Sequence, residues 1–147
     1  MFTRTALALA ALIFAGSLGA AEVRSSAADQ QLHNQVISNA LSATARVRAA
    51  VEDYHLRHNA LPADSADLGL DPQSWATPDI KRVSVGANGR IEITLAATSG
   101  VEDGVIRLTP TASASTDENK IDWSCTSPSY STIADATSGF CEYSKLP

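Results

Sequence analysis

The chain has 147 residues, a formal net charge of −5 and 44% hydrophobic residues, which is the size and composition of one globular domain. The excess of acidic over basic residues argues against a nucleic-acid partner, because binding to phosphates depends on clustered lysines and arginines. It also argues against attraction to an anionic membrane surface, and leaves solubility as the main effect of the charge.

The first residues have the organisation of an export leader. Arg4 supplies a positive charge, an apolar run follows, and small residues surround a predicted cleavage site after Ala21, with Ala20 as the alternative. We therefore predict an export signal peptide at residues 1–21 and a mature domain at residues 22–147, whose net charge without Arg4 is −6. The alternative is an uncleaved membrane anchor, but the run ends short of the about 20 residues that span a bilayer.

A long helix is predicted at about residues 26–58. Ser26 is a candidate cap at its start, Asn59 is a suitable stop, and Pro62 prevents continuation. One stripe with helical spacing runs along it: Val36, Ala40, Thr44, Val47, Val51 and Tyr54. We expect the polar stretch 29–35 to project and the stripe to dock on the rest of the domain.

A loop between helix and sheet, here called the αβ loop, is predicted at about residues 60–79. Two prolines, a glycine and repeated aspartates prevent regular structure there. We expect Leu68 and Leu70 to tuck beneath this loop.

From about residue 80 to 125 the apolar period changes to two, which predicts four strands around residues 83–85, 91–95, 106–108 and 121–125. Asn88-Gly89 predicts a hairpin turn and Glu102-Asp103-Gly104 a second turn, whereas Pro110 is expected to close the third strand. The sheet would have one apolar face that only the helix can cover. The predicted fold class is therefore α+β, a long N-terminal helix packed on a four-stranded antiparallel meander.

Cys125 and Cys141 are the only cysteines of the chain. In an exported protein such a pair predicts a disulfide, and closing this C-terminal loop at residues 125–141 contributes about 3 kcal/mol in the chain-entropy account. The alternative is a redox or metal-binding thiol pair, but the spacing is not Cys-x-x-Cys and further ligands are not close by.

Three segments together resemble type IV pilins of the type IVa major class. Residues 40–54, followed by Asn59-Ala60-Leu61-Pro62, resemble the end of the long pilin helix, except that Leu61 replaces the usual aromatic residue. Residues 105–111 resemble the pilin strand that ends in L-x-P. Ile121-Asp122-Trp123-Ser124-Cys125 resembles the pilin I-x-W-x-C motif, and Cys141 the closing cysteine. The resemblance covers residues 40–147 and implies a pilin-like globular domain.

The N-terminus departs from that family, because pilins carry a leader ending in glycine, then Phe-Thr-Leu-Ile-Glu and a long apolar stem. The resemblance therefore implies a soluble pilin head, exported to the periplasm or the cell surface. Such a head would present the cysteine loop and the αβ loop to another pilin, a pilus-assembly protein or a host surface. The alternatives are a membrane-anchored subunit of the pilus fibre with a divergent leader and, less favoured, a DNA-uptake minor pilin.

Other candidate chemistry is weak in this sequence. Glu52, His55 and His58 have the spacing of metal ligands on one helix face, and two acidic groups could offer oxygens to calcium: Asp64 with Asp67, and residues 117–119 with Asp122. Solvated turns are the simpler interpretation, and serine-nucleophile motifs do not occur. We predict no enzyme, cofactor, metal or small-molecule substrate. Three aromatic residues could contact a partner or pin the loop to the sheet: Tyr130, Phe140 and Tyr143.

Overall fold

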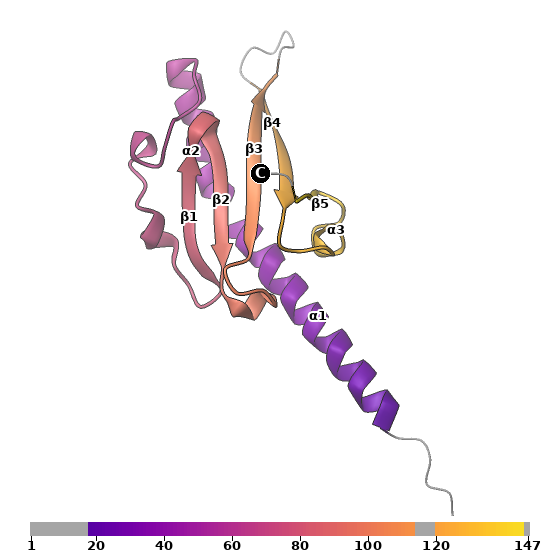
Figure 1. Ribbon diagram of the computed structural model, residues 1–147. Coiled ribbons are helices and arrows are strands. Elements are labelled where there is room, and N and C mark those ends of the chain that lie inside the picture. Colours follow the sequence, from indigo (N-terminus) through magenta and orange to yellow (C-terminus); the bar gives the residue numbers. More distant parts are fainter. Residues whose placement is uncertain (1–17, 114–119, 146–147) are drawn as a thin grey trace, which may run out of the picture.

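A computed structural model describes residues 18–113 and 120–145, with side chains from residue 26 onward. The predicted leader therefore lies almost entirely outside the described residues, as does the acidic stretch 117–119. Within the described part, a helical rod lies against one face of a five-stranded sheet (Figure 1). The predicted α+β architecture is confirmed.

The rod consists of two helices, α1 (Leu18–Ala43) and α2 (Ala45–His58), which meet at a bend (Figure 1). Helical backbone hydrogen bonds continue through the bend. The Thr44 amide donates to the Ala40 carbonyl at 3.2 Å. The Thr44 hydroxyl is buried and donates to the Leu41 carbonyl at 2.8 Å, a back-bond that often bends helices. The sequence predicts one helix, and the structure shows one rod with this local bend.

The ends of the rod are defined differently. Asn59 ends α2 with a left-handed backbone (φ 49°), as expected for this stop, and its amide donates to the His55 carbonyl. At the other end, α1 begins at Leu18, so the predicted cap Ser26 lies inside the helix. Capping residues favour a helix start without requiring one, since serine has only a modest helix penalty.

The predicted stripe is buried at five positions: Val36, Ala40, Thr44, Val47 and Val51. Tyr54 is half-buried, and His55 is buried beside it. The polar residues before the stripe are exposed from Ser26 to Leu32, so the N-terminal part of α1 projects from the domain as expected (Figure 1).

The sheet has the order β1-β2-β3-β4-β5. The first four strands form the predicted antiparallel meander: β1 (Ile80–Gly86), β2 (Arg90–Leu95), β3 (Val105–Ala112) and β4 (Ile121–Ser127). A fifth strand, β5 (Cys141–Tyr143), adds in parallel to β4. The sequence did not predict β5, because three residues are too few to show an alternating pattern.

Pro110 does not close the third strand, and this expectation was wrong. Strand β3 continues to Ala112, and Pro110 pairs with Trp123 of β4. Pairing with β2 ends at Leu108, so Pro110 has a neighbouring strand on one side only. A proline is tolerated at such a position because no ladder donor is needed on the open side.

Both predicted turns are present. Asn88 and Gly89 have φ angles of 59° and 69°, which is why this dipeptide favours a hairpin. In the second turn Asp103 has φ 56°. Its carboxylate and that of Glu102 bind the ammonium of Lys81 on β1, and these hydrogen bonds, from Asp103 first, raise the pKa of Lys81. The ion pair fixes the second turn to the edge of the sheet.

The core lies between the rod and the sheet. Strand residues facing the rod are almost fully buried: Val83, Val85, Ile91, Ile93, Leu95, Ile106 and Leu108. They form one cluster with Ile37, Ala40, Val47 and Val51 of the rod. Each fully buried side chain of this size contributes about 1.5–3 kcal/mol relative to exposure. The expectation that the helix covers the apolar face is confirmed.

Gly89 lies where the rod, the αβ loop and β3 meet, and we predict that even the methyl group of an alanine is costly there. A Cβ there would lie 3.1 Å from Val51 and 3.2 Å from Pro110. Gly69 has a similar φ of 62° but nothing within 4 Å. Gly69→Ala should cost about 1 kcal/mol of unfolding free energy from backbone strain alone. Gly89→Ala should cost about 1–3 kcal/mol more, from overpacking. Urea unfolding of both variants checks this, and equal losses would contradict the packing argument.

Candidate interaction surface

The C-terminal loop begins and ends at a disulfide. Cys125 of β4 and Cys141 of β5 are bonded, with a Cα–Cα distance of 4.4 Å and a sequence separation of 16. They are also directly paired residues of the two parallel strands. Both are almost fully buried, so the disulfide fixes the first residue of β5 beside the sheet.

Inside the loop, Ser127 organises the backbone. Its hydroxyl donates to the Val105 carbonyl at 2.6 Å and accepts from the amides of Ser129 and Tyr130. The Ser129 hydroxyl in turn accepts from the Val105 amide at 3.0 Å. The loop therefore turns back onto the first residue of β3. A short helix, α3 (Ile133–Ala136), follows, with Ile133 completely buried in the core.

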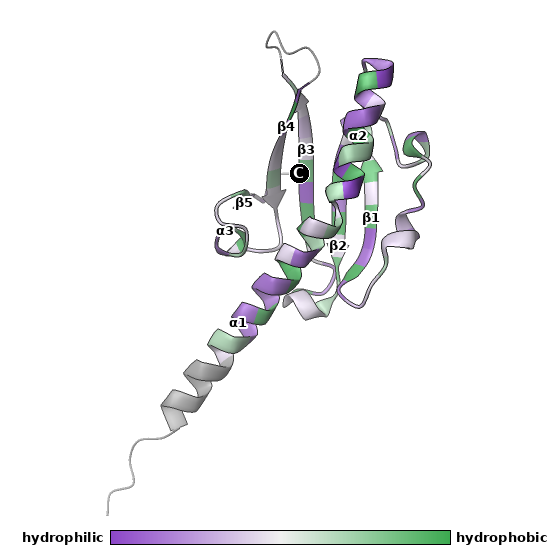
Figure 2. Cartoon of the chain, turned by 180° about the vertical axis from the view of Figure 1, so that it is seen from behind, coloured by the Kyte–Doolittle hydropathy of each residue, from purple (hydrophilic) through white to green (hydrophobic). Residues whose placement is uncertain are grey.

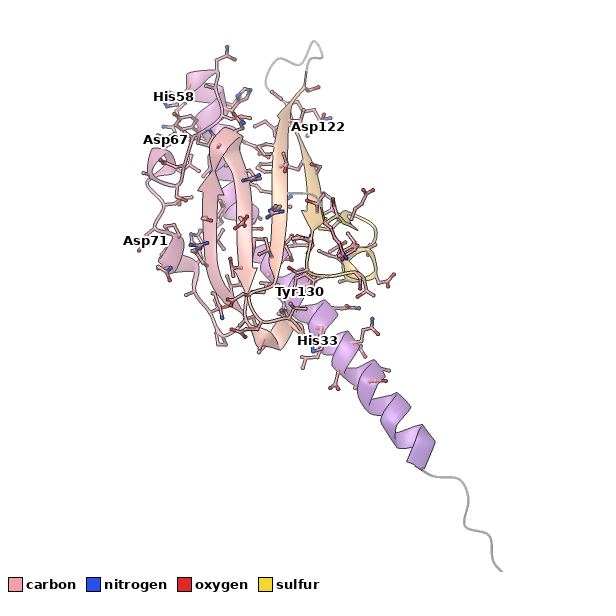
Figure 3. The ribbon with its side chains drawn as sticks, in the orientation of Figure 1. His33, His58, Asp67, Asp71, Asp122 and Tyr130 are labelled. Carbon is pink, nitrogen blue, oxygen red and sulfur yellow. A yellow bond between two sulfur atoms is a disulfide. The ribbon has the colours of Figure 1, made fainter. Side chains whose placement is uncertain are left out.

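Tyr130 points inward from this loop (Figure 3). It is 6% exposed, and its hydroxyl lies 2.5 Å from the Ser99 hydroxyl. The ring occupies the space beside Gly104, where a Cβ would lie 1.9 Å from the tyrosine oxygen. Burial raises the pKa of Tyr130 above its ordinary value of 10.0, while the Ser99 hydrogen bond acts in the opposite direction. The buried ring thus holds the loop against the turn that contains Ser99, and a role of Tyr130 as a partner contact stays a prediction.

Phe140 and Tyr143 lie at the other end of the loop and differ from Tyr130. Their side chains are 43% and 41% exposed, among the few large hydrophobic side chains of the described residues that reach solvent. Phe140 directly precedes the disulfide and Tyr143 ends β5. Both are held by a rigid frame and remain our predicted partner contacts.

The αβ loop is ordered by its own aspartates. Asp64 accepts from the amides of Ala66 and Asp67, Asp67 accepts from the Ala63 amide at 2.7 Å, and Asp71 accepts from the Gln73 amide. These hydrogen bonds stabilise two 3₁₀ helices, η1 (Ala66–Leu68) and η2 (Pro72–Trp75). Asp67 and Asp71 lie on the outer side of the loop (Figure 3). Leu68 and Leu70 pack against the core, as predicted. The aspartates thus have a structural role in the turns.

The candidate metal ligands on α2 do not converge in the structure. His55 is buried, whereas His58 is exposed and stacks on Tyr54 with ring centroids 4.3 Å apart. Glu52 accepts a hydrogen bond from the indole of Trp123 at 2.8 Å, which joins α2 to β4. Among the described residues, histidine, cysteine and acidic side chains form no group of three that could hold a metal ion.

The projecting part of α1 is the remaining large exposed element. Leu32 is 59% exposed on it, and His33 lies beside Gly100 where the projection leaves the domain (Figure 3). In the part of the chain with described coordinates, no helix combines the length and apolar character needed to cross a membrane.

Two residues that lie beside the C-terminal loop were not predicted as site residues. Ser99 has no sequence signal, because only the fold brings it to Tyr130. Arg48 is not one of the residues of the predicted apolar stripe, yet it is half-buried and lines a pocket of about 330 Å³ between the rod and the C-terminal loop. Its position on the helix could have suggested this, since it lies four residues after the buried Thr44 and three before the buried Val51.

A helical rod, an antiparallel sheet and a disulfide-closed C-terminal loop together define a type IV pilin-like head. The sequence model of the pilins, the proteins of a bacterial filament, matches residues 35–139, more than half of the chain, and the chain therefore belongs to the pilin family. Comparison with curated proteins gives no match. Pilins are structural, non-enzymatic proteins of the cell surface that assemble with other pilus components, so this chain is a pilus structural protein with protein partners.

We predict that Tyr130→Phe lowers the unfolding free energy by about 1 kcal/mol at pH 7, because Ser99 loses a buried partner. This loss should shrink as the pH rises above about 10. The folded state holds the Tyr130 proton more tightly than the unfolded state, so the wild-type protein loses stability as the pH rises through the raised pKa. The Tyr130→Phe variant has no titrating hydroxyl at this position, so its stability does not change for this reason. Urea unfolding between pH 7 and 11 measures the difference; Tyr143→Phe is the exposed control, and a pH-independent difference would contradict the argument.

We further predict that Cys125→Ala with Cys141→Ala costs about 3 kcal/mol of unfolding free energy. The loop between them should also be cleaved faster by proteases, because the covalent link between β4 and the three-residue strand β5 would be lost. Reduction of the wild-type protein is the matched control and should reproduce both effects. Unchanged protease sensitivity would show that Ser127 and Tyr130 hold the loop without the disulfide.

Proposed function

We propose that this chain is an exported pilin head that presents its C-terminal loop and αβ loop to a protein partner, either a pilus component or a surface target. The single observation that carries the proposal is the polar projection of α1. Figure 2 shows hydrophilic residues on α1 where it extends away from the sheet. Residues 26–32 are exposed and include Asp29, Gln30 and Gln31. In an apolar filament core these groups would be buried without partners, which is costly.

The partner contacts of this head are predicted from exposure and rigidity. Phe140 and Tyr143 are exposed aromatic residues on a frame closed by a disulfide. Aromatic side chains in rigid positions are frequent centres of binding energy, because few rotamers are lost on contact. The αβ loop adds outward carboxylates, which favour a basic or polar partner surface.

A second candidate function is a membrane-anchored pilus subunit. The observation that favours it is the continuity of α1, which begins at Leu18 and runs through the predicted cleavage position after Ala21. A helix that extends through this point is what a continuous pilin stem requires. DNA uptake is less favoured because of the net charge of −5, and a salt-dependent shift of duplex DNA would support it.

The N-terminus of the exported protein separates the first two functions. We predict that sequencing will find a start at Ala21 or Glu22 and that the protein will be recovered from the periplasm or medium. Ala20→Leu with Ala21→Leu removes the small residues at both cleavage positions and should retain the leader. Wild-type protein that keeps residues 1–21 and is recovered as a major component of sheared filaments would overturn the proposal in favour of the anchored subunit.

A further inference from the structure

The groove between the rod and the C-terminal loop contains an arginine with no partner. The pocket of about 330 Å³ is formed by the end of α1, the start of α2 and the segment after α3. Figure 2, which views the molecule from the side of the rod, shows α3 beside α1, and the two helices are in contact. The groove therefore lies between the rod and the C-terminal loop.

Arg48 differs from every other basic side chain that the structure describes. Four of these side chains are in ion pairs: Arg57, Lys81, Arg107 and Lys120. Four more are exposed to solvent: Arg46, Arg82, Arg90 and Lys145. Arg48 alone is half-buried without an ion pair, and its Nε is buried with no hydrogen-bond acceptor. An unpaired buried donor is unfavourable, and the part of the half-buried guanidinium that lines the groove is available to an acceptor that enters it.

The remaining walls restrict what that acceptor can be. Leu41, Ala136 and the exposed Phe140 supply apolar surface. Hydroxyl side chains line the rest of the groove: Ser38, Ser42, Thr137 and Ser138. A guanidinium prefers a carboxylate, which it binds with two parallel hydrogen bonds. The apolar walls would cover the carbon atoms next to that carboxylate. The positive charge of Arg48 and the apolar part of the lining thus fit an aspartate or glutamate flanked by an apolar residue.

We propose that this groove, lined by Arg48 and Phe140, binds an acidic segment of another protein subunit. The inference rests on the proposed function in one respect, since it requires a protein partner. It adds the chemistry of recognition: a carboxylate held by Arg48 and a neighbouring apolar side chain against Phe140 and Leu41. Acidic residues exceed basic residues in this chain, so a second copy also has carboxylates to offer, and the experiment identifies which subunit supplies them.

The test exploits the neighbouring Arg46, which lies on the same helix but is exposed and unpaired. Purified full-length exported protein is mixed with filaments sheared from the bacterium that makes it, and co-sedimentation is measured. Arg48→Glu should weaken binding by about tenfold or more, because it places a like charge against the carboxylate. Arg46→Glu has the same net charge and should bind as the wild-type protein does. Equal binding by both variants would overturn the proposal.

A second variant keeps the test informative if Arg48→Glu folds poorly. Arg48→Lys preserves the charge and introduces an amine that a carbodiimide joins directly to a contacting carboxylate. Mass spectrometry should find this cross-link to an acidic residue of another pilin or of a second copy, at a yield well above that of Arg46→Lys. Absence of this excess overturns the proposal, even if N-terminal sequencing supports the exported head. Binding of polygalacturonate that depends on Arg48, without a protein cross-link, would reassign the groove to a glycan.

Discussion

The structure depends on one constraint: the apolar face of a small antiparallel sheet must be covered, and the rod is the element available to cover it. Val47 and Val51 of α2 are buried against strand residues such as Ile91 and Leu108. This contact fixes which face of the rod is turned inward and therefore which residues are left outside. The projection of α1, the exposure of Arg46 and the partial burial of Arg48 all follow from the orientation that the core imposes.

Much of the fold could be predicted from periodicity and turn chemistry. Spacings of three and four gave the docking stripe of the rod, alternation gave four strands, and Asn88-Gly89 gave a hairpin whose two residues have positive φ angles. These features are local, so a single sequence contains them. The bend at Thr44 and the continuation of β3 past Pro110 could not be predicted, because each depends on its surroundings in the fold. The first depends on a buried hydroxyl, and the second on the place where β2 begins beside β3.

The candidate site was predicted less completely than the fold, because the exposure of its side chains depends on residues that are distant in sequence. The cysteine pair is a compositional signal and indicated the disulfide directly. Tyr130 and Phe140 are both aromatic residues of one loop, yet one is buried beneath Gly104 and the other is exposed. Their difference is set by residues distant in sequence, including Ser99. Likewise, the partial burial of Arg48 depends on the C-terminal loop folding over the rod.

The two margins of the sheet have a consequence for behaviour at high concentration. Strand β5 is three residues long, and η2 packs along the outer margin of β1. Long bare strand edges template pairing with neighbouring molecules and lead to amyloid-like deposits. Here the strand at one margin is short, and η2 packs against the strand at the other. The protein can therefore reach a high local concentration and engage neighbours through side chains, with little risk that sheets from different molecules will fuse.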